Sequence, residues 1–271
     1  DKVFRKITEK HFGSKIKYLI NTHEHGDHTT GNFLFRDCEI IAHQSCVDGM
    51  KNRVTDRKRV IQWFKSYIPQ MEQKLKEMKA GSDKYKQQKE DITVKKMRFK
   101  SLLAKHPMQL PTKTFKESMK LDMGNKTIEL LYAGGIHTTS DIFVFIPEEG
   151  MLFTGDVMAD VWLTDTPGCL ASFGLRPQTK KNLPLLYKNW EYLLTQKNKI
   201  KHYLPGHWNG TLSYQGFKER LAYVKTLQKE VTRAAKSEKG LRQLFVTLSL
   251  KNKFPHLVGK PGFTRNFVHN Q

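Results

Sequence analysis

The chain has 271 residues and a net charge of +21, and 38% of its residues are hydrophobic and 11% aromatic. This composition excludes a disordered chain, three cysteines exclude a disulfide framework, and no apolar run approaches the length that spans a bilayer. The length suits one large domain, with or without an insertion. The positive charge attracts polyanions, but no known nucleic-acid-binding module accompanies it, so we favour a surface kept soluble by like charge.

The first part of the chain predicts a helix, a strand and a polar loop. Residues 2–12 are predicted to form a short helix, and residues 16–20 form an apolar run that is typical of a strand buried on both faces. The histidine-rich segment 21–30 follows directly. A short helix and a second strand are predicted next, at 33–35 and 40–42.

Residues 51–105 differ from the rest of the chain and predict a helical hairpin. Their apolar residues recur at steps of three and four, as on one side of a helix. This apolar stripe consists of Ile61, Phe64, Ile68, Met71, Leu75 and Met78. Pro69 should kink the first helix, and Gly81-Ser82 predicts the turn. The segment carries 17 Lys and Arg against 6 Asp and Glu, about half of the excess charge of the chain. We interpret the stripe as packing rather than as a cofactor site.

The remainder alternates strand and helix signals, which indicates an α/β fold. Strands are predicted at 127–133, 142–146, 151–154 and 202–204, and helices around 186–194 and 217–231. Four of the predicted strands of the chain are each followed at once by residues that bind metals. These residues are His23, His25, Asp27 and His28 after the first strand, then His137, Asp156 and His207. Because open α/β sheets place their sites at the carboxyl ends of strands, we expect these side chains to converge. Imidazole and carboxylate ligands suit zinc, iron or manganese.

The order and the loop context of these residues resemble the metallo-β-lactamase superfamily. Residues 23–28, His-Glu-His-Gly-Asp-His, match its metal-binding signature. His137 in Gly-Ile-His-Thr-Thr-Ser-Asp, Asp156 in Phe-Thr-Gly-Asp and His207 in Leu-Pro-Gly-His resemble its later metal ligands. The match covers residues 16–210, interrupted by the hairpin. The resemblance implies an αβ/βα sandwich.

Carried over position by position, the resemblance implies two metal sites that share one carboxylate. The first site would be His23, His25 and His137, the second Asp27, His28 and His207, and the bridge Asp156. Two divalent cations, preferably zinc and otherwise iron or manganese, would lower the pKa of a bridging water towards ~7. The resulting hydroxide would attack a small ester, thioester, lactone or related substrate. Asp27 would act as a catalytic residue by orienting this hydroxide.

An aspartate at position 156 is similar to glyoxalase II and lactonases, whereas some β-lactamases carry cysteine or serine there. We therefore expect a small-molecule substrate and regard β-lactamase activity as an alternative. A second alternative is a nuclease or phosphodiesterase of the same fold, which the basic hairpin favours and the lack of an accessory nuclease motif disfavours. Nucleic acid is thus a partner that we do not favour. A third alternative is a non-catalytic binding protein.

Other residues near the motifs are predicted to have structural or pocket-lining roles. Glu24 is expected to be exposed, and Asp141 to fix the loop that carries His137. His11, His43 and His202 are expected to be structural. Four residues are expected either to line the pocket or to pack in the core: Trp162, Phe173, Trp208 and Asn209.

The domain organisation predicted from these features is a single metallo-β-lactamase-fold domain over residues 1–271, with residues 51–105 as a basic insertion. Proteins of this fold usually have several strands before the first histidine motif. Only 22 residues precede His23. We therefore expect a fold that is short at its amino end, either because the sequence is truncated there or because the fold lacks part of one sheet.

Overall fold

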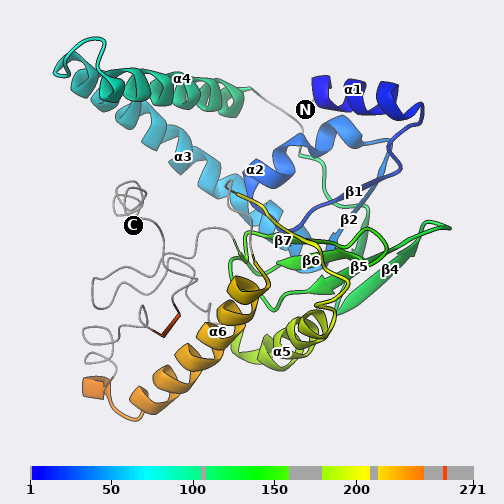
Figure 1. Ribbon diagram of the computed structural model, residues 1–271. Helices are drawn as coiled ribbons and strands as arrows, with labels where there is room; N and C mark the ends of the chain where they lie inside the picture. Colours follow the sequence, from blue (N-terminus) through cyan, green and yellow to red (C-terminus); the bar gives the residue numbers. More distant parts are fainter. Residues whose placement is uncertain (1, 105–107, 159–178, 208–212, 241–252, 255–271) are drawn as a thin grey trace.

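The structure is a computed structural model, and it describes residues 2–104, 108–158, 179–207, 213–240 and 253–254. In this part of the chain two β-sheets lie against each other, helices α5 and α6 cover the outer face of the larger sheet, and helices α3 and α4 extend away from both sheets (Figure 1). No helix among the described residues is both long enough and apolar enough to cross a membrane.

The smaller sheet contains three parallel strands in the order β1–β2–β3. They are β1 (Tyr18–Ile20), β2 (Glu39–His43) and β3 (Lys113–Phe115). In β2, Ile41 is fully buried, which fits the continuous apolar run of this segment. Both β1 and β2 occur where the sequence predicts them, within one or two residues.

The larger sheet contains five strands in the order β4–β5–β6–β7–β8. They are β4 (Ser118–Asp122), β5 (Thr127–Tyr132), β6 (Ile142–Ile146), β7 (Met151–Gly155) and β8 (His202–Pro205). Neighbouring strands are antiparallel except β7 and β8, which are parallel. The strands predicted at 127–133, 142–146, 151–154 and 202–204 are confirmed as β5, β6, β7 and β8.

The main core lies between the larger sheet and two helices, α5 (Thr179–Thr195) and α6 (Tyr214–Ala234). The ring of Phe143 in β6 lies with its centroid 5.3 Å from that of Trp190 in α5 and 5.7 Å from that of Phe217 in α6. All three side chains are fully buried. These aromatic contacts fix the helices against the sheet.

A second core lies between the two sheets. Successive side chains of a strand point to opposite faces, so Ile142 and Val144 turn away from the helices that contact Phe143. They pack instead with Ile41 of the smaller sheet and with Leu130 of β5. Burial of both faces explains why the segment 142–146 is apolar throughout.

Helix α1 (Lys2–Phe12), helix α2 (Gly26–Thr29) and the 3-10 helix η1 (Thr30–Phe35) belong to the amino-terminal third. The predicted helix at 2–12 is confirmed. Its apolar residues Val3 and Phe4 are exposed, however, rather than packed on the sheets. Arg5 joins α1 to the body through an ion pair with Asp37.

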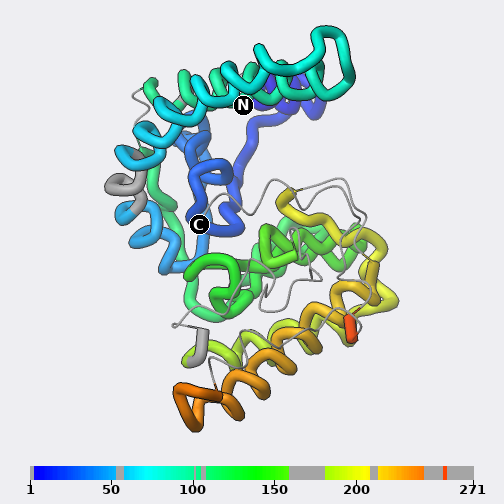
Figure 2. Tube along the Cα trace, turned by 90° about the vertical axis from the view of Figure 1, so that its left-hand side faces the viewer, coloured from blue at the N-terminus to red at the C-terminus, as the bar shows by residue number. Residues whose placement is uncertain are grey.

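Helices α3 (Ser45–Lys76) and α4 (Asp83–Leu103) pack along each other as a hairpin, with the turn at the predicted place (Figure 2). Helix α3 starts six residues earlier than the predicted segment and continues through Pro69 without interruption. That residues 51–105 are an insertion in the family fold, and that the fold is short at its amino end, remain predictions.

Candidate metal centre

The seven predicted metal-binding residues meet in one place. The loops that carry them follow β1, β5, β7 and β8, whose carboxyl ends lie at the same edge of the two sheets. Potential ligand atoms form two groups, and within each group they all lie within 4.8 Å of one another. The first group is His23, His25, His137 and Asp156, and the second is Asp27, His28 and His207.

Pairs of imidazoles from different loops face each other across the centre. His25 Nδ1 lies 2.9 Å from His137 Nε2, and His28 Nε2 lies 3.2 Å from His207 Nε2. Two nitrogens bound to one tetrahedral zinc at about 2.1 Å would be roughly 3.4 Å apart. The imidazole pairs are therefore close to the spacing that a shared cation requires.

Asp156 occupies the middle of the centre. Its Oδ2 lies 3.3 Å from the Nε2 atoms of His137 and His207 and 3.5 Å from those of His23 and His28. These four histidines come from both groups, so one carboxylate oxygen contacts each half of the centre. Asp27 contacts only the second half, with its Oδ2 3.1 Å from His207 Nε2.

Two glycines allow the β7 and β8 loops to approach Asp156. Gly155 has a φ of +51°, in the left-handed region that side chains disfavour, and it turns the chain directly before the carboxylate. A Cβ atom on Gly206 would lie 2.2 Å from Asp156 Oδ1. A side chain at Gly206 would push the carboxylate from the middle of the centre, and one at Gly155 would strain the turn and press against Thr22.

A shell of hydrogen bonds holds the loop that carries His137. The carboxylate of Asp141 is buried and accepts from the backbone N–H of His137 at 2.6 Å and from Thr138 through its backbone N–H and its hydroxyl. Burial raises the pKa of Asp141. This geometry matches the positioning role expected for Asp141.

Glu24 is buried, and the expectation that it is exposed was wrong. Its carboxylate accepts a hydrogen bond from the Ser140 hydroxyl, whose oxygen also accepts from the Glu24 backbone N–H at 3.1 Å. Gly49 of α3 packs so closely that a Cβ there would lie 2.5 Å from Glu24 Cγ. Glu24 thus joins the histidine-motif loop to the His137 loop. A sequence motif shows the spacing of the ligands along the chain but not which residues of other elements pack against them. Sequence reasoning therefore missed this contact.

Two further polar contacts support the histidine motif from behind. The side-chain amides of Asn21 and Asn32 exchange hydrogen bonds of 3.0 and 2.9 Å. His43 stacks on Tyr132 with ring centroids 3.9 Å apart, and its Nδ1 lies 2.7 Å from the Ser45 hydroxyl. Burial lowers the pKa of His43 to about 4, so the ring is neutral at physiological pH. These contacts give His43 a structural role.

The carboxylates and imidazoles of the centre shift one another's titration. Burial lowers the pKa of His28, but the side chains of Asp156 and Asp27 outweigh burial and raise this pKa to about 9. Burial raises the pKa of Asp156, but His137, His23 and His28 outweigh it and hold the pKa far below its ordinary value. The His28 side chain likewise lowers the pKa of Asp27. The centre therefore holds two ionised carboxylates, those of Asp156 and Asp27, which attract a cation.

The donor set fits metal ions. His23 Nε2 and Asp156 Oδ1 are buried and have no hydrogen-bond partner among the described residues. A buried polar atom left unpaired costs about 1–3 kcal/mol, which coordination of a cation would offset. Four imidazoles around one carboxylate are the ligand chemistry of zinc and of similar transition metals.

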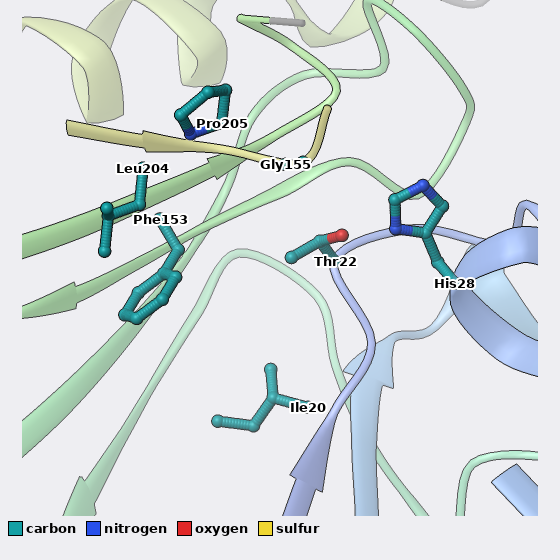
Figure 3. A pocket seen from close by; sticks show the side chains of 8 residues that line it. Ile20, Thr22, His28, Phe153, Gly155, Leu204 and Pro205 are labelled. Carbon is teal, nitrogen blue, oxygen red and sulfur yellow. The ribbon is translucent and has the colours of Figure 1, made fainter. Parts of the chain in front are cut away.

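A small pocket of about 180 Å³ opens beside this centre (Figure 3). Its walls are mainly apolar and come from strands of both sheets, with Ile20, Phe153 and Leu204 among the lining residues. Thr22 and the ring of His28 close the end nearest the metal ligands. The pocket thus joins an apolar space to His28, one of the predicted metal ligands.

Of the remaining predicted residues, those that the structure describes do not join the centre. His11 and His202 are exposed and belong to neither group of ligands. Cys38 and Cys46 are buried and belong to neither group of ligands. Outside the described residues lie Trp162, Cys169, Phe173, Trp208 and Asn209.

Comparison with known proteins agrees with this geometry. The model of the metallo-β-lactamase superfamily matches residues 12–167, more than half of the chain. The chain therefore belongs to the metallo-β-lactamase superfamily. It is a metal-dependent hydrolase of that fold, with plausible His and Asp ligands in place. The comparison with curated protein sequences gives no significant match.

Several solved structures are similar. A metallo-β-lactamase from Pontibacter korlensis is 14% identical, with a TM-score of 0.47 over 84% of this chain and 76% of that one. The metallo-β-lactamase IND-7 is 13% identical, with a TM-score of 0.46 over 82% of this chain and 75% of that one. The DIM-1 metallo-β-lactamase exposed to ceftazidime is 16% identical, with a TM-score of 0.45 over 82% and 73%.

Proposed function

We propose that the protein is a binuclear hydrolase of a small ester, thioester or lactone. One cation would be held by His23, His25 and His137, the other by Asp27, His28 and His207, with Asp156 between them. The observation that carries this proposal is the contact of Asp156 Oδ2, at 3.3–3.5 Å, with imidazoles of both groups. A carboxylate shared in this way sets the spacing of two cations.

Two divalent cations at this position would supply a water of lowered pKa and would polarise the carbonyl oxygen under attack. Zinc is the preferred ion because imidazoles dominate the ligand set. The protein residues supply the positioning. Asp141 fixes the His137 backbone, and Glu24 holds the same loop to the histidine motif through Ser140.

Asp27 is the group best placed to orient the attacking water. Its side chain is 38% exposed, whereas that of Asp156 is 5% exposed, so Asp27 faces the open side of the centre. Its lowered pKa keeps it ionised and able to accept a hydrogen bond from water. The pocket beside His28 would receive the apolar part of a substrate, and a volume of about 180 Å³ suits a small group.

The test combines metal content with a substrate panel. Elemental analysis of gently purified protein should find close to two equivalents of zinc, iron or manganese per chain. The metal-loaded protein should turn over at least one ester, thioester or lactone faster than a β-lactam reporter and a phosphodiester. A metal content near zero after reconstitution would refute the binuclear centre. Turnover of the phosphodiester alone would replace the proposed substrate class with that of a nuclease.

A further inference from the structure

The α3–α4 hairpin exposes most of its positive charge to solvent. Six acids within residues 51–105 cannot neutralise the 17 Lys and Arg of the same segment. The described exposed cations lie on both helices and around the turn: Lys51, Lys58, Arg59, Lys65, Lys74, Lys76, Lys79, Lys84, Lys86, Lys89, Lys96, Arg98 and Lys100. Helix α4 alone is about 30 Å long, so the charge forms an extended surface.

The hairpin uses its apolar residues internally. Phe64, Ile68, Met71 and Ile92 are buried, and the Phe64 ring stacks on the Phe99 ring with centroids 5.8 Å apart. Since these residues already join α3 to α4, the charged outer surface is not needed to hold the hairpin together. Both views show the hairpin extending away from the sheets (Figures 1 and 2).

One side of the hairpin combines stacked aromatic rings with cations. Trp63 and Tyr67, one helical turn apart on α3, stack with ring centroids 4.5 Å apart and an interplanar angle of 20°. Lys95 of α4 places its Nζ 5.9 Å from the centroid of the Trp63 ring. Trp63, Tyr67, Lys95 and Arg98, which lies one turn after Lys95, are named here the aromatic–cation cluster.

The aromatic–cation cluster carries a local excess of positive charge. Burial lowers the pKa of Lys95, the like charge of Arg98 lowers it further, and the opposite charge of Asp91 offsets only part of this shift. An anion bound between these two cations would relieve their repulsion. Both aromatic rings are partly exposed, which leaves ring surface for a ligand.

We infer that the α3–α4 hairpin binds single-stranded nucleic acid, with phosphates on its exposed cations and on the partly exposed Lys95, and a base on the aromatic pair Trp63–Tyr67. Single strands fit this surface better than duplexes because only unpaired bases can stack on a side chain. The inference does not depend on which substrate the metal centre hydrolyses. Val94 and Met97 are exposed on α4, so an anionic membrane is the competing partner.

Binding of a labelled 15-nucleotide single-stranded RNA, followed by fluorescence anisotropy between 50 and 300 mM KCl, tests the inference. The logarithm of the association constant should fall linearly with the logarithm of salt concentration. Lys95→Gln with Arg98→Gln should reduce that slope by roughly 1.4, because each phosphate contact to a single strand contributes roughly 0.7. Lys218→Gln with Lys229→Gln, two exposed cations on α6, is the matched control and should leave the slope nearly unchanged.

The stacking contact is tested separately. Tyr67→Leu and Trp63→Leu should each weaken binding by roughly 5- to 100-fold at fixed salt without changing the slope. Circular dichroism checks that helix content is retained, and turnover at the metal centre should stay at the level of the unchanged protein. Equal losses in the α6 control and the Lys95/Arg98 variant would overturn the inference in favour of general charge attraction. Equal affinity for duplex RNA, or binding to phosphatidylglycerol vesicles with no binding to RNA, would also overturn it.

Discussion

The metal centre and the α3–α4 hairpin use charged side chains in opposite ways. In the metal centre, histidines and aspartates from four loops form two groups, each with its ligand atoms within 4.8 Å of one another, and neighbouring side chains shift the pKa values of His28, Asp27 and Asp156. In the hairpin, cations point outward around two helices, where water screens them from one another. Because the charged groups of the centre are partly buried, each needs its partners to be stable. A single exposed charge of the hairpin can instead be replaced at little cost to stability.

The two regions also differ in what holds them. The loops of the centre are fixed by two sheets, by glycines such as Gly206 that admit close approach, and by Asp141 and Glu24. The hairpin is held chiefly by buried apolar residues between its own two helices, namely Phe64, Ile68, Met71 and Ile92, which are called here the apolar seam. We therefore expect substitutions in the centre to affect function first and substitutions in the seam to affect local stability first.

The largest expected effect follows from Asp156→Ala. Removal of the carboxylate that contacts four imidazoles should lower turnover by about 10²- to 10³-fold, the loss that follows removal of one preorganised group. Bound metal should fall by at least one equivalent. Asp122→Ala, at an exposed strand end, is the control for loss of an acid. Full metal content with unchanged turnover in Asp156→Ala would contradict the bridging role.

Phe64→Ala should break the seam of the hairpin and leave the centre in place. Loss of a buried aromatic side chain costs about 3–5 kcal/mol. Hydrogen exchange should accelerate across residues 60–100 and stay slow in β5 and β6, with turnover close to that of the unchanged protein. Phe143→Ala, which removes the same side chain from the main core, should instead speed exchange in the sheet. Joint unfolding of hairpin and sheets in Phe64→Ala would show that the two regions are one cooperative unit.

Glu24→Ala tests whether a residue that only positions the loops of the metal centre affects metal binding. It removes the acceptor that links the histidine motif to Ser140, so metal affinity should fall by roughly 10- to 100-fold. Glu24→Gln keeps an acceptor and the packing against Gly49 and should lose less. Both variants are titrated with zinc by competition against a chelating dye. If both variants bind zinc as the unchanged protein does, Glu24 has no positioning role.

The smallest expected effect concerns His43, behind the centre. Its folded-state pKa is about 4 and its ordinary value is 6.5, so between these pH values the unfolded chain binds more protons than the folded one. The stability that this neutral ring contributes is complete above about pH 6.5 and is lost as pH falls towards 4. The free energy of unfolding should drop by roughly 1 kcal/mol between pH 7.5 and 5.5 on this account. Denaturant titrations of His43→Gln should show a smaller drop, and an identical drop would assign the pH dependence to other groups.

The sequence by itself located most of the elements and the candidate ligand set. Apolar runs and helical periodicity located α1, β1, β2, β5, β6, β7 and β8, because backbone hydrogen bonding and burial impose those periods locally. The seven ligand-type residues were identified because three histidines and an aspartate within six positions, together with single histidines or aspartates after later strands, are rare without a metal. The hairpin was found from its apolar stripe, but its start was placed late because Gly49 and the charged stretch 51–59 separate the first turn of α3 from that stripe.

Only the tertiary structure decided how these pieces act on one another. Glu24 was expected to be exposed, and it is buried because α3 brings Gly49 against it and the β5–β6 loop brings Ser140. The exposed apolar residues of α1 were equally unpredictable, since periodicity shows that a helix has an apolar side but not whether a partner covers it. Likewise, the central position of Asp156 depends on the distances among four loops. Those distances follow from the packing of two sheets, which arises from contacts far apart in the chain.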